Sequence, residues 1–184
     1  INGYTQSGAV ANTATTNANN AVLKIELNGA GVAFFSGLFL AGDEAEGTTI
    51  KGLAINRFGG GGLSINTDDT VIEGNFIGTD PTGTIDRGND RDGVRVNSSD
   101  NLIGGSANAA QNIISGNGGD GVSVVGTDST GNVVSNNHIG TDADAGEDLS
   151  NSENGVFVTS PGVVVGGERY ERGGERRGGR SGGR

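Results

Sequence analysis

The 184-residue chain contains no cysteine, methionine or tryptophan, and it has only two prolines and one histidine. Without cysteine there is no disulfide, no thiol nucleophile and no cysteine-type zinc site. Two prolines and the lack of a Gly-X-Y period exclude a collagen-like chain in spite of 37 glycines. No apolar run approaches the roughly 20 residues of a membrane-spanning helix, so no membrane span is expected.

The charge is acidic and unevenly distributed. The whole chain has a formal net charge of −10. Residues 168–184 contain six arginines and three glutamates, so the other 167 residues carry a net charge of −13. Such a body is not expected to bind nucleic acid or an anionic membrane. It suits a secreted or cell-surface protein, or one that binds cations.

A long internal repeat is the main feature of the sequence. TVIEGNFIGTDPTGTIDRGNDRDGVRVNSSDNLIGG (70–105) aligns without a gap on NVVSNNHIGTDADAGEDLSNSENGVFVTSPGVVVGG (132–167), at an offset of 62. The offset divides into coils of 31 residues, which are 70–100, 101–131 and 132–162. A shorter coil of 21 residues (49–69) precedes them. Strands that keep their place while one loop changes length are typical of solenoids.

Within each coil the apolar residues recur with period two, which predicts strands and not helices. At one strand site the outer two residues should point inward and the middle one outward. This site is LSI (63–65), VRV (94–96), VSV (122–124) and VFV (156–158). A second site keeps Ile55, Ile77, Ile114 and Ile139, and a third falls at 50–51, 71–72, 102–103, 133–134 and 163–164.

Three short strands per coil, with Gly, Asn and Asp at the corners, predict an all-β right-handed parallel β-helix. Asn75, Asn112 and Asn137 precede the Ile column and should form a stacked amide ladder. We expect this domain to span residues 1–167. We expect it to be incomplete at both ends, since neither shows a capping helix, and the chain to be a processed product or an excised piece.

The coils resemble those of the pectate-lyase-like superfold. More closely, they resemble repetitive secreted or surface β-helix proteins of bacteria. The resemblance rests on N-x-I-G-T-D-x-x-G at 75–83, on the same motif one residue longer at 137–146, and on N-x-I-S-G-N-x-x-x-G-V-x-V at 112–124. The starts INGYTQSG (1–8) and LKIELNGAG (23–31) are also similar. The resemblance implies a secreted or surface β-helix, and it does not imply one function.

The Arg/Gly-rich tail (168–184) breaks the repeat, because a turn and a strand should follow Gly167. Read one base later, Glu-Arg codons give Asn or Ser, and the tail then resembles the missing coil. We therefore interpret it as an out-of-frame reading of a further coil. The alternative is an arm that binds single-stranded nucleic acid, although one tyrosine, Tyr170, offers little stacking.

Catalytic constellations are sparse. His138 is the single histidine and is expected to point outward alone, so no Ser-His-Asp set can be built. NTDD (66–69) resembles the Asn-Thr-Asp element of polygalacturonase-like hydrolases, whose second Asp pair, Gly-His-Gly and Arg-x-Lys are missing here. Asp68 and Asp69 are candidate acid/base residues only if both lie in a turn, because neighbouring strand residues point to opposite faces.

The resemblance to β-helix lyases implies Ca²⁺ held by carboxylates, together with an Arg or Lys base. Arg95 should face outward and is the candidate base, with Lys51 and Arg57 as further candidates. No organic cofactor is expected. GTDADAGED (140–148) suggests a calcium site, although Asx turns would explain its acids without metal. The candidate metal ligands are Asp142, Asp144, Glu147 and Asp148.

Outward aromatic residues are few, namely Phe39 and Phe157, with Phe76 as a third candidate. Phe157 and Arg95 are the candidate glycan-binding residues. We expect a non-catalytic secreted or surface β-helix scaffold, adhesin-like and able to contact glycans. The alternative is a polysaccharide lyase or hydrolase of the β-helix type. Partners would be a polysaccharide, or another protein chain bound at an exposed coil end.

Overall fold

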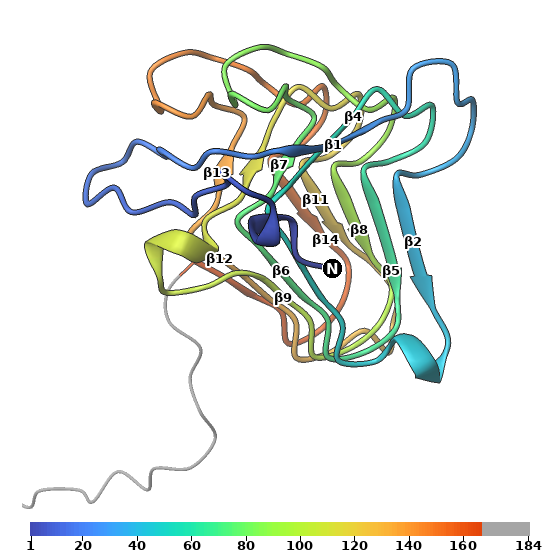
Figure 1. Ribbon diagram of the computed structural model, residues 1–184. Coiled ribbons are helices and arrows are strands. Elements are labelled where there is room, and N and C mark those ends of the chain that lie inside the picture. The colour runs from blue at the N-terminus through green and yellow to red at the C-terminus, as the bar shows by residue number, and fades with distance from the viewer. Residues whose placement is uncertain (167–184) are drawn as a thin grey trace, which may run out of the picture.

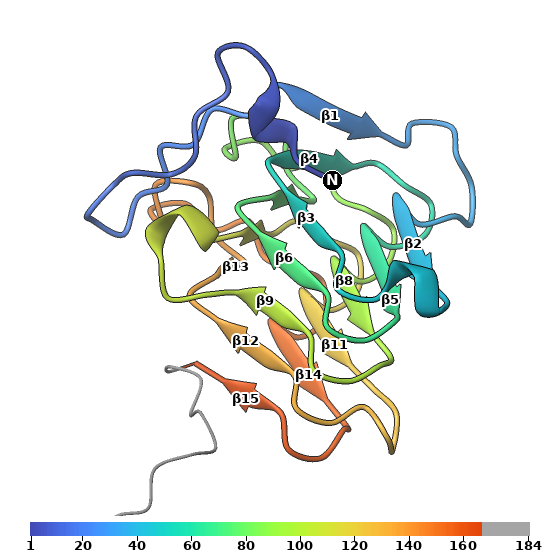
Figure 2. The same ribbon diagram turned by 60° about the horizontal axis from the view of Figure 1, so that its bottom comes forward.

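Residues 1–166 are described by a computed structural model, and they form a right-handed parallel β-helix (Figures 1 and 2). In each coil the chain passes once through each of three parallel sheets of five strands. The fold class predicted from the repeat is therefore confirmed. Among the described residues, no helix has the length and apolarity to cross a membrane. The predicted tail lies outside the described residues.

The chain passes through the first, second and third sheets in that order within each coil. The first sheet contains β1 (Ile25–Asn28), β4 (Leu53–Asn56), β7 (Phe76–Ile77), β10 (Ile113–Ile114) and β13 (His138–Ile139). The second contains β2 (Leu38–Ala41), β5 (Leu63–Asn66), β8 (Val94–Val96), β11 (Val122–Val124) and β14 (Val156–Val158). The third contains β3 (Thr49–Lys51), β6 (Val71–Glu73), β9 (Leu102–Gly104), β12 (Val133–Ser135) and β15 (Val164–Val165). Short 3-10 turns are η1 (Gly3–Thr5), η2 (Asp43–Ala45) and η3 (Asn108–Ala110).

The strand registers confirm two of the predicted columns. In the second sheet the outer aliphatic residues of each triplet point inward, and Val94, Val96, Val122 and Val124 are fully buried. In the first sheet Ile55, Ile77, Ile114 and Ile139 pair in register. Burial of such a column removes apolar surface from water at about 25 cal/mol per Å², which stabilises one coil on the next.

The predicted alignment of the third strand site is wrong by one residue in the first and in the last coil. The structure pairs Ile50 with Ile72, and Val134 with Val165, so the site falls at 49–50 and 164–165. The side-chain period of a strand is two, so a one-residue error exchanges the inward and outward faces. The fully buried side chain is Ile50, and Lys51 points outward to Glu73.

Stacked asparagines stabilise the corners of the coil. The predicted ladder forms, because Asn75 Nδ2 donates to Asn112 Oδ1 over 3.2 Å and Asn112 Nδ2 donates to Asn137 Oδ1 over 2.8 Å. Each amide also donates to a backbone carbonyl, as Asn112 does to Ile72. The ladder thus satisfies backbone groups that a corner would leave buried without partners. Two further ladders, which were not predicted, link Asn89, Asn117 and Asn151, and Asn101 and Asn132.

A second, smaller core covers the outer face of the first sheet. Phe76 points out of the coil, as considered from the sequence, but its side chain is fully buried, so it is not an exposed aromatic residue that a glycan could contact. It packs with Ile113, Leu23 and Ala143, and Tyr4 lies partly buried beside them. The N-terminal segment and the loop after β13 supply these residues, so sequence-distant chain covers a face that the repeat alone would expose.

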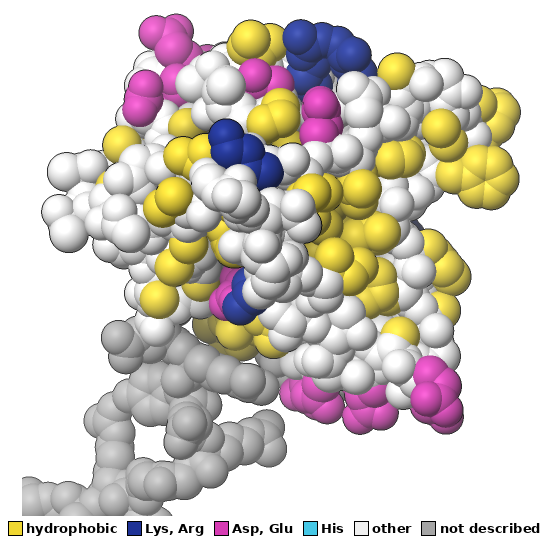
Figure 3. Space-filling model, viewed as in Figure 1, with side chains coloured by type: hydrophobic (Ala, Val, Ile, Leu, Met, Phe, Trp, Pro, Cys, Tyr) yellow, Lys and Arg dark blue, Asp and Glu magenta, His cyan; other side chains and the backbone are white. Residues whose placement is uncertain are grey.

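The two ends of the solenoid differ. At the N-terminal end Asn2 bridges Lys51 of β3, and the Tyr4 hydroxyl donates to the Gly74 carbonyl over 2.7 Å. Hydrophobic side chains still show over the middle of this end (Figure 3). At the other end β13, β14 and β15 are the outermost strands of their sheets among the described residues.

The central amide of the first ladder gives a stability test. We expect Asn112→Ala to lower the free energy of unfolding by about 3 kcal/mol, because it leaves several buried polar groups unpaired. Asn97→Ala is the matched control, since Asn97 is exposed and donates only one 3.4 Å bond, so a change within about 0.5 kcal/mol is expected. Urea unfolding measures both, and equal effects would contradict the role of the ladder.

Tyr4 gives a pH test of the N-terminal end. Burial, and then the Glu73 carboxylate, raise the pKa of Tyr4 to about 12 from 10.0. The neutral phenol is therefore favoured in the folded state, so its contribution is complete below pH 10 and is lost as the pH rises from 10 to 12. We expect the urea midpoint to fall over this window and Tyr4→Phe to show a smaller fall. If the urea midpoint fell equally with pH in the unmodified chain and in Tyr4→Phe, the raised pKa of Tyr4 would be contradicted.

Candidate functional site

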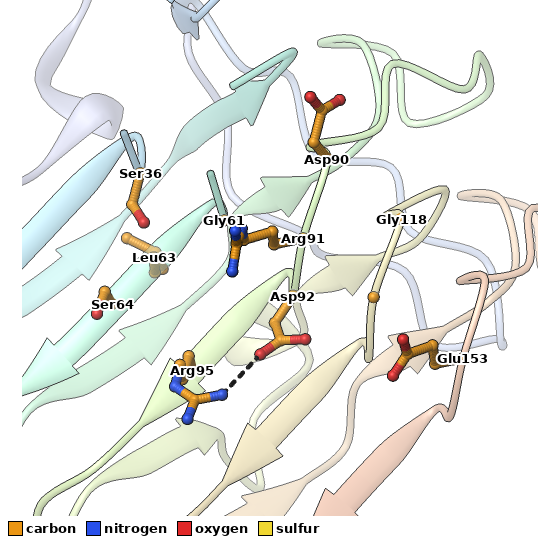
Figure 4. Close-up of a pocket in the computed structure, with 11 residues that line it drawn as sticks. Ser36, Gly61, Leu63, Ser64, Asp90, Arg91, Asp92, Arg95, Gly118 and Glu153 are labelled. Carbon is orange, nitrogen blue, oxygen red and sulfur yellow. Dashed lines mark hydrogen bonds and ion pairs between the residues drawn. The ribbon is translucent and has the colours of Figure 1, made fainter. Parts of the chain in front are cut away.

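A groove of about 500 Å³ lies on the outer face of the second sheet, near the starts of its strands (Figure 4). Its charged side chains are Asp90, Arg91, Asp92, Arg95 and Glu153. The rest of its lining consists of small residues and one leucine, namely Ser36, Gly61, Leu63, Ser64, Gly118 and Gly119. Of the sequence candidates, the groove contains Arg95.

The groove exists because large and small residues alternate from coil to coil. The outward column of the second sheet reads Phe39, Ser64, Arg95, Ser123 and Phe157. Since neighbouring strands lie about 4.8 Å apart, Arg95 projects between two short serines, with an aromatic ring at each end of the column. The repeat keeps the backbone constant, so these outward residues are free to vary.

Bare backbone forms one wall of the groove. A Cβ on Gly60 would lie 2.6 Å from the Phe35 carbonyl carbon, and a Cβ on Gly61 would lie 2.6 Å from the Asp92 oxygen. The GGGG stretch (59–62) is therefore required by the close approach of the coils on both sides. Gly60 N–H donates to the Phe35 carbonyl over 3.0 Å and so fixes the loop that carries Ser36.

The charges in the groove are partly paired. Arg95 Nη1 lies 3.3 Å from Asp92 Oδ2, and the other oxygen of Asp92 accepts the Asp120 backbone N–H over 3.0 Å. Asp92 therefore orients Arg95 and also binds the next coil. Among the described residues the only other ion pair is Lys51–Glu73, which leaves the exposed guanidinium of Arg91 available to a ligand.

The carboxylates of the groove come from different loops and are not aligned with one another. In Figure 4, the carboxylates of Asp90 and Glu153 point in different directions, and Asp92 faces Arg95. Within residues 1–166, no three acidic or histidine side chains are grouped closely enough to hold a metal ion. What the arrangement offers is two guanidinium groups, hydroxyl groups and exposed backbone beside short side chains. These are hydrogen-bonding groups that suit a polar or anionic ligand.

Asp68 and Asp69 lie together in the turn after β5, and both are exposed. Asp68 Oδ1 accepts the Ser99 backbone N–H of the next coil over 2.7 Å, and Asp69 has a φ of 56°. The condition set for acid/base work, that both lie in a turn, is met. The observed contact is nevertheless a coil-to-coil hydrogen bond, and neither residue lines the groove. Their catalytic role stays a prediction.

The candidate metal residues lie in the loop after β13. Asp142 is buried, and its Oδ1 accepts the backbone N–H groups of Gly146 and Glu147 over 2.9 and 3.2 Å. Asp148 accepts a bond from the Ser150 hydroxyl. Asp144 and Glu147 are exposed. These are local bonds from the loop backbone to the Asp142 side chain, and calcium binding by the loop stays a prediction.

The remaining candidates are scattered. Phe157 is 40% exposed on β14 at the end of the outward column, which agrees with its predicted direction. Lys51 pairs with Glu73 on the third sheet, and Arg57 lies in the turn after β4 with a φ of 61°. His138 was expected to point outward, away from other catalytic residues. Its side chain is half-buried, and its buried Nδ1 has no hydrogen-bond partner among the described residues.

Sequence reasoning missed Arg91, Asp92 and Glu153. Arg91 and Asp92 precede the strand triplet 94–96, and Glu153 precedes the triplet 156–158. A signal was available, because four of the six basic residues before the tail fall between 57 and 95 in an acidic body. The sequence did not predict that Arg91, Asp92 and Glu153 lie on one face, because the corner before each strand triplet varies in length.

Comparisons of the chain with protein-family models, with curated proteins and with solved structures gave no significant match.

Asp142 allows a test that separates a structural role in its loop from a calcium site. We expect Asp142→Ala to lower the free energy of unfolding by about 1–2 kcal/mol, because two backbone N–H groups lose their acceptor. Asp142→Asn keeps an oxygen acceptor, so it should change stability by less than about 0.5 kcal/mol. Thermal unfolding with and without millimolar Ca²⁺ completes the test. A calcium-dependent stabilisation that Asp142→Asn abolishes would establish the metal site.

Proposed function

We propose that this chain is a non-catalytic β-helix scaffold, secreted or on a cell surface, that binds a polysaccharide along the outer face of its second sheet. The observation that carries this proposal is the groove around Arg95. It is open, polar and lined by one free and one paired guanidinium group. An extended polymer suits it, because the outward column continues for five strands with an aromatic residue at each end.

Several features of the groove support binding over catalysis. The one histidine lies on the first sheet and does not line the groove, whose carboxylates point in different directions. Arg95 is held by Asp92, and such a pair is suited to orient a ligand carboxylate or hydroxyl. Bacterial origin and adhesin-like use remain part of this proposal, and they rest on the resemblance of the repeat motifs.

A polysaccharide-degrading enzyme is the second candidate. The observation in its favour is that arginine and carboxylate side chains share one groove. The assay is release of reducing ends from acidic and neutral polysaccharides, with millimolar Ca²⁺ and with EDTA. Release abolished by EDTA would identify a calcium-dependent lyase. Release unaffected by EDTA would identify a carboxylate-pair hydrolase, and either result would replace the scaffold proposal.

The binding proposal is tested by Arg95→Ser, which places in this coil the residue found in the coils on either side. We expect affinity for the bound polysaccharide to fall at least about tenfold, because a charged hydrogen-bond donor contributes about 1.5–3 kcal/mol. Lys24→Ser is the matched control, since it removes one exposed positive charge outside the groove. Affinity gel electrophoresis and calorimetry measure both.

Equal losses in the two variants would indicate a general charge effect and would contradict a site at Arg95. Failure of the unmodified protein to bind any polymer of the panel would overturn the proposal. Phe157→Ala extends the test to the end of the column, where we expect a smaller loss, of about three- to tenfold, from lost ring contact.

A further inference from the structure

Three phenylalanines are exposed on and beside the loop that joins β1 to β2. Phe34, Phe35 and Phe39 are 84, 72 and 68% exposed, and no other aromatic side chain within residues 1–166 is exposed to that extent. The loop protrudes beyond the matching corners of the following coils (Figures 1 and 2), and hydrophobic side chains lie over it in Figure 3. Exposure of several phenyl rings to water is unfavourable, so this cluster is a candidate contact surface.

The backbone of this loop is fixed against the next coil. Gly59 N–H donates to the Val32 carbonyl over 2.9 Å, and Gly60 N–H donates to the Phe35 carbonyl over 3.0 Å. A Cβ on Gly59 would lie 2.8 Å from the Phe34 nitrogen, so no side chain fits between the loop and the next coil. The exposed rings are therefore carried by a held backbone, which lowers the conformational entropy that they lose when they contact a ligand.

Packing does not explain where these rings lie. Phe34 has a φ of 67°, which is a left-handed conformation that is costly for a bulky side chain. The space beneath the loop is already filled by Phe58, whose ring atoms would lie 2.4 Å from a Cβ on Gly29 and 2.9 Å from one on Gly37. The loop thus holds a strained and exposed phenylalanine outside the core, and an outlier of this kind points to a function.

The phenylalanine cluster is continuous with the groove around Arg95. Ser36 belongs to the same loop and lines the groove (Figure 4). Phe39 begins the outward column of the second sheet, where it pairs in register with Ser64, and Ser64 pairs with Arg95. Since neighbouring strands lie about 4.8 Å apart, Phe39 is about 10 Å from Arg95 along this column. An extended ligand that contacts Arg95 can therefore also contact the rings.

We propose that Phe34, Phe35 and Phe39 form a stacking subsite for sugar rings at this end of the groove. The ligand class is a β-1,4-linked polysaccharide of gluco configuration. Its equatorial hydroxyl groups and linkages leave C–H groups on both faces of each ring and keep the chain extended. These polarised C–H groups suit the negative face of a phenyl ring. The inference rests on the proposed polysaccharide binding, and it adds the sugar configuration.

The surroundings of the rings favour a sugar over a membrane or a protein. Residues 29–37 contain no Lys or Arg and the chain has a net charge of −10, whereas segments that insert into a membrane surface combine apolar with basic residues. Three phenyl side chains offer about 500 Å² in all. This area is below the roughly 800 Å² that each partner contributes to a standard protein interface.

Phe34→Asn separates binding from folding. Asn tolerates a left-handed backbone and the lost side chain is exposed, so we expect the urea midpoint to stay the same or to rise. The affinity for cellohexaose and for carboxymethylcellulose, measured by calorimetry, should fall about three- to tenfold, as expected for one lost ring contact. Lower stability with unchanged affinity would show that Phe34 is structural and would contradict the subsite.

The double variant Phe34→Asn/Phe35→Ser should lower the same affinities at least about tenfold. Ile85→Ser is the matched control, because Ile85 is 50% exposed on a loop that does not line the groove, and we expect a change within about twofold. If the unmodified chain binds and the double variant binds equally well, the stacking subsite is overturned while the groove proposal stands. If the unmodified chain binds no polymer, both are overturned.

The sugar class is tested with Phe34→Trp, which keeps an aromatic ring and introduces the first tryptophan of the chain. We expect its fluorescence to change with cellohexaose and not with polygalacturonate, whose α-linkages and axial hydroxyl groups interrupt the apolar ring faces. A response to polygalacturonate alone would overturn the proposed configuration. A response to phosphatidylcholine vesicles and to no sugar would overturn the subsite and identify a membrane contact.

Discussion

In-register stacking of one coil on the next is the interaction on which the rest of the structure depends. Each strand is only two to four residues long and would not be stable alone. Stacking satisfies its backbone on both sides and buries a narrow aliphatic core between three sheets. A chain with 32% hydrophobic residues can fold in this way because most of its inward positions are Ile, Leu or Val.

The same constraint explains the polar residues. Corners cannot form sheet ladders, so their backbone groups need other partners, and in the middle coils the asparagine ladders supply them. Loops that leave the stack pair their backbone groups locally. Asp142, for example, accepts hydrogen bonds from the backbone N–H groups of Gly146 and Glu147. Many acidic residues that resemble ligands in the sequence are therefore turn residues in the structure, with Asp68 as a second example.

Positions that stacking does not constrain carry the functional possibilities. The middle residue of each triplet in the second sheet points out of the coil, and its variation from Phe to Ser to Arg leaves a groove beside Arg95 on a uniform scaffold. The glycine stretch before β5 deepens it by allowing close backbone approach.

The 62-residue offset and the period-two pattern were enough to predict the sheets, the inward columns and the Asn75 ladder, because each depends on local alternation repeated along the chain. Phe76 shows the limit of such reasoning, since the distant segment around Leu23 covers it. Arg91 and Arg95 share a groove because Gly118 and Gly119, in the next coil, are small. Sequence alone determined which residues repeat, and only the tertiary structure decided which unrelated side chains lie next to one another, because that depends on loop lengths and on packing across coils.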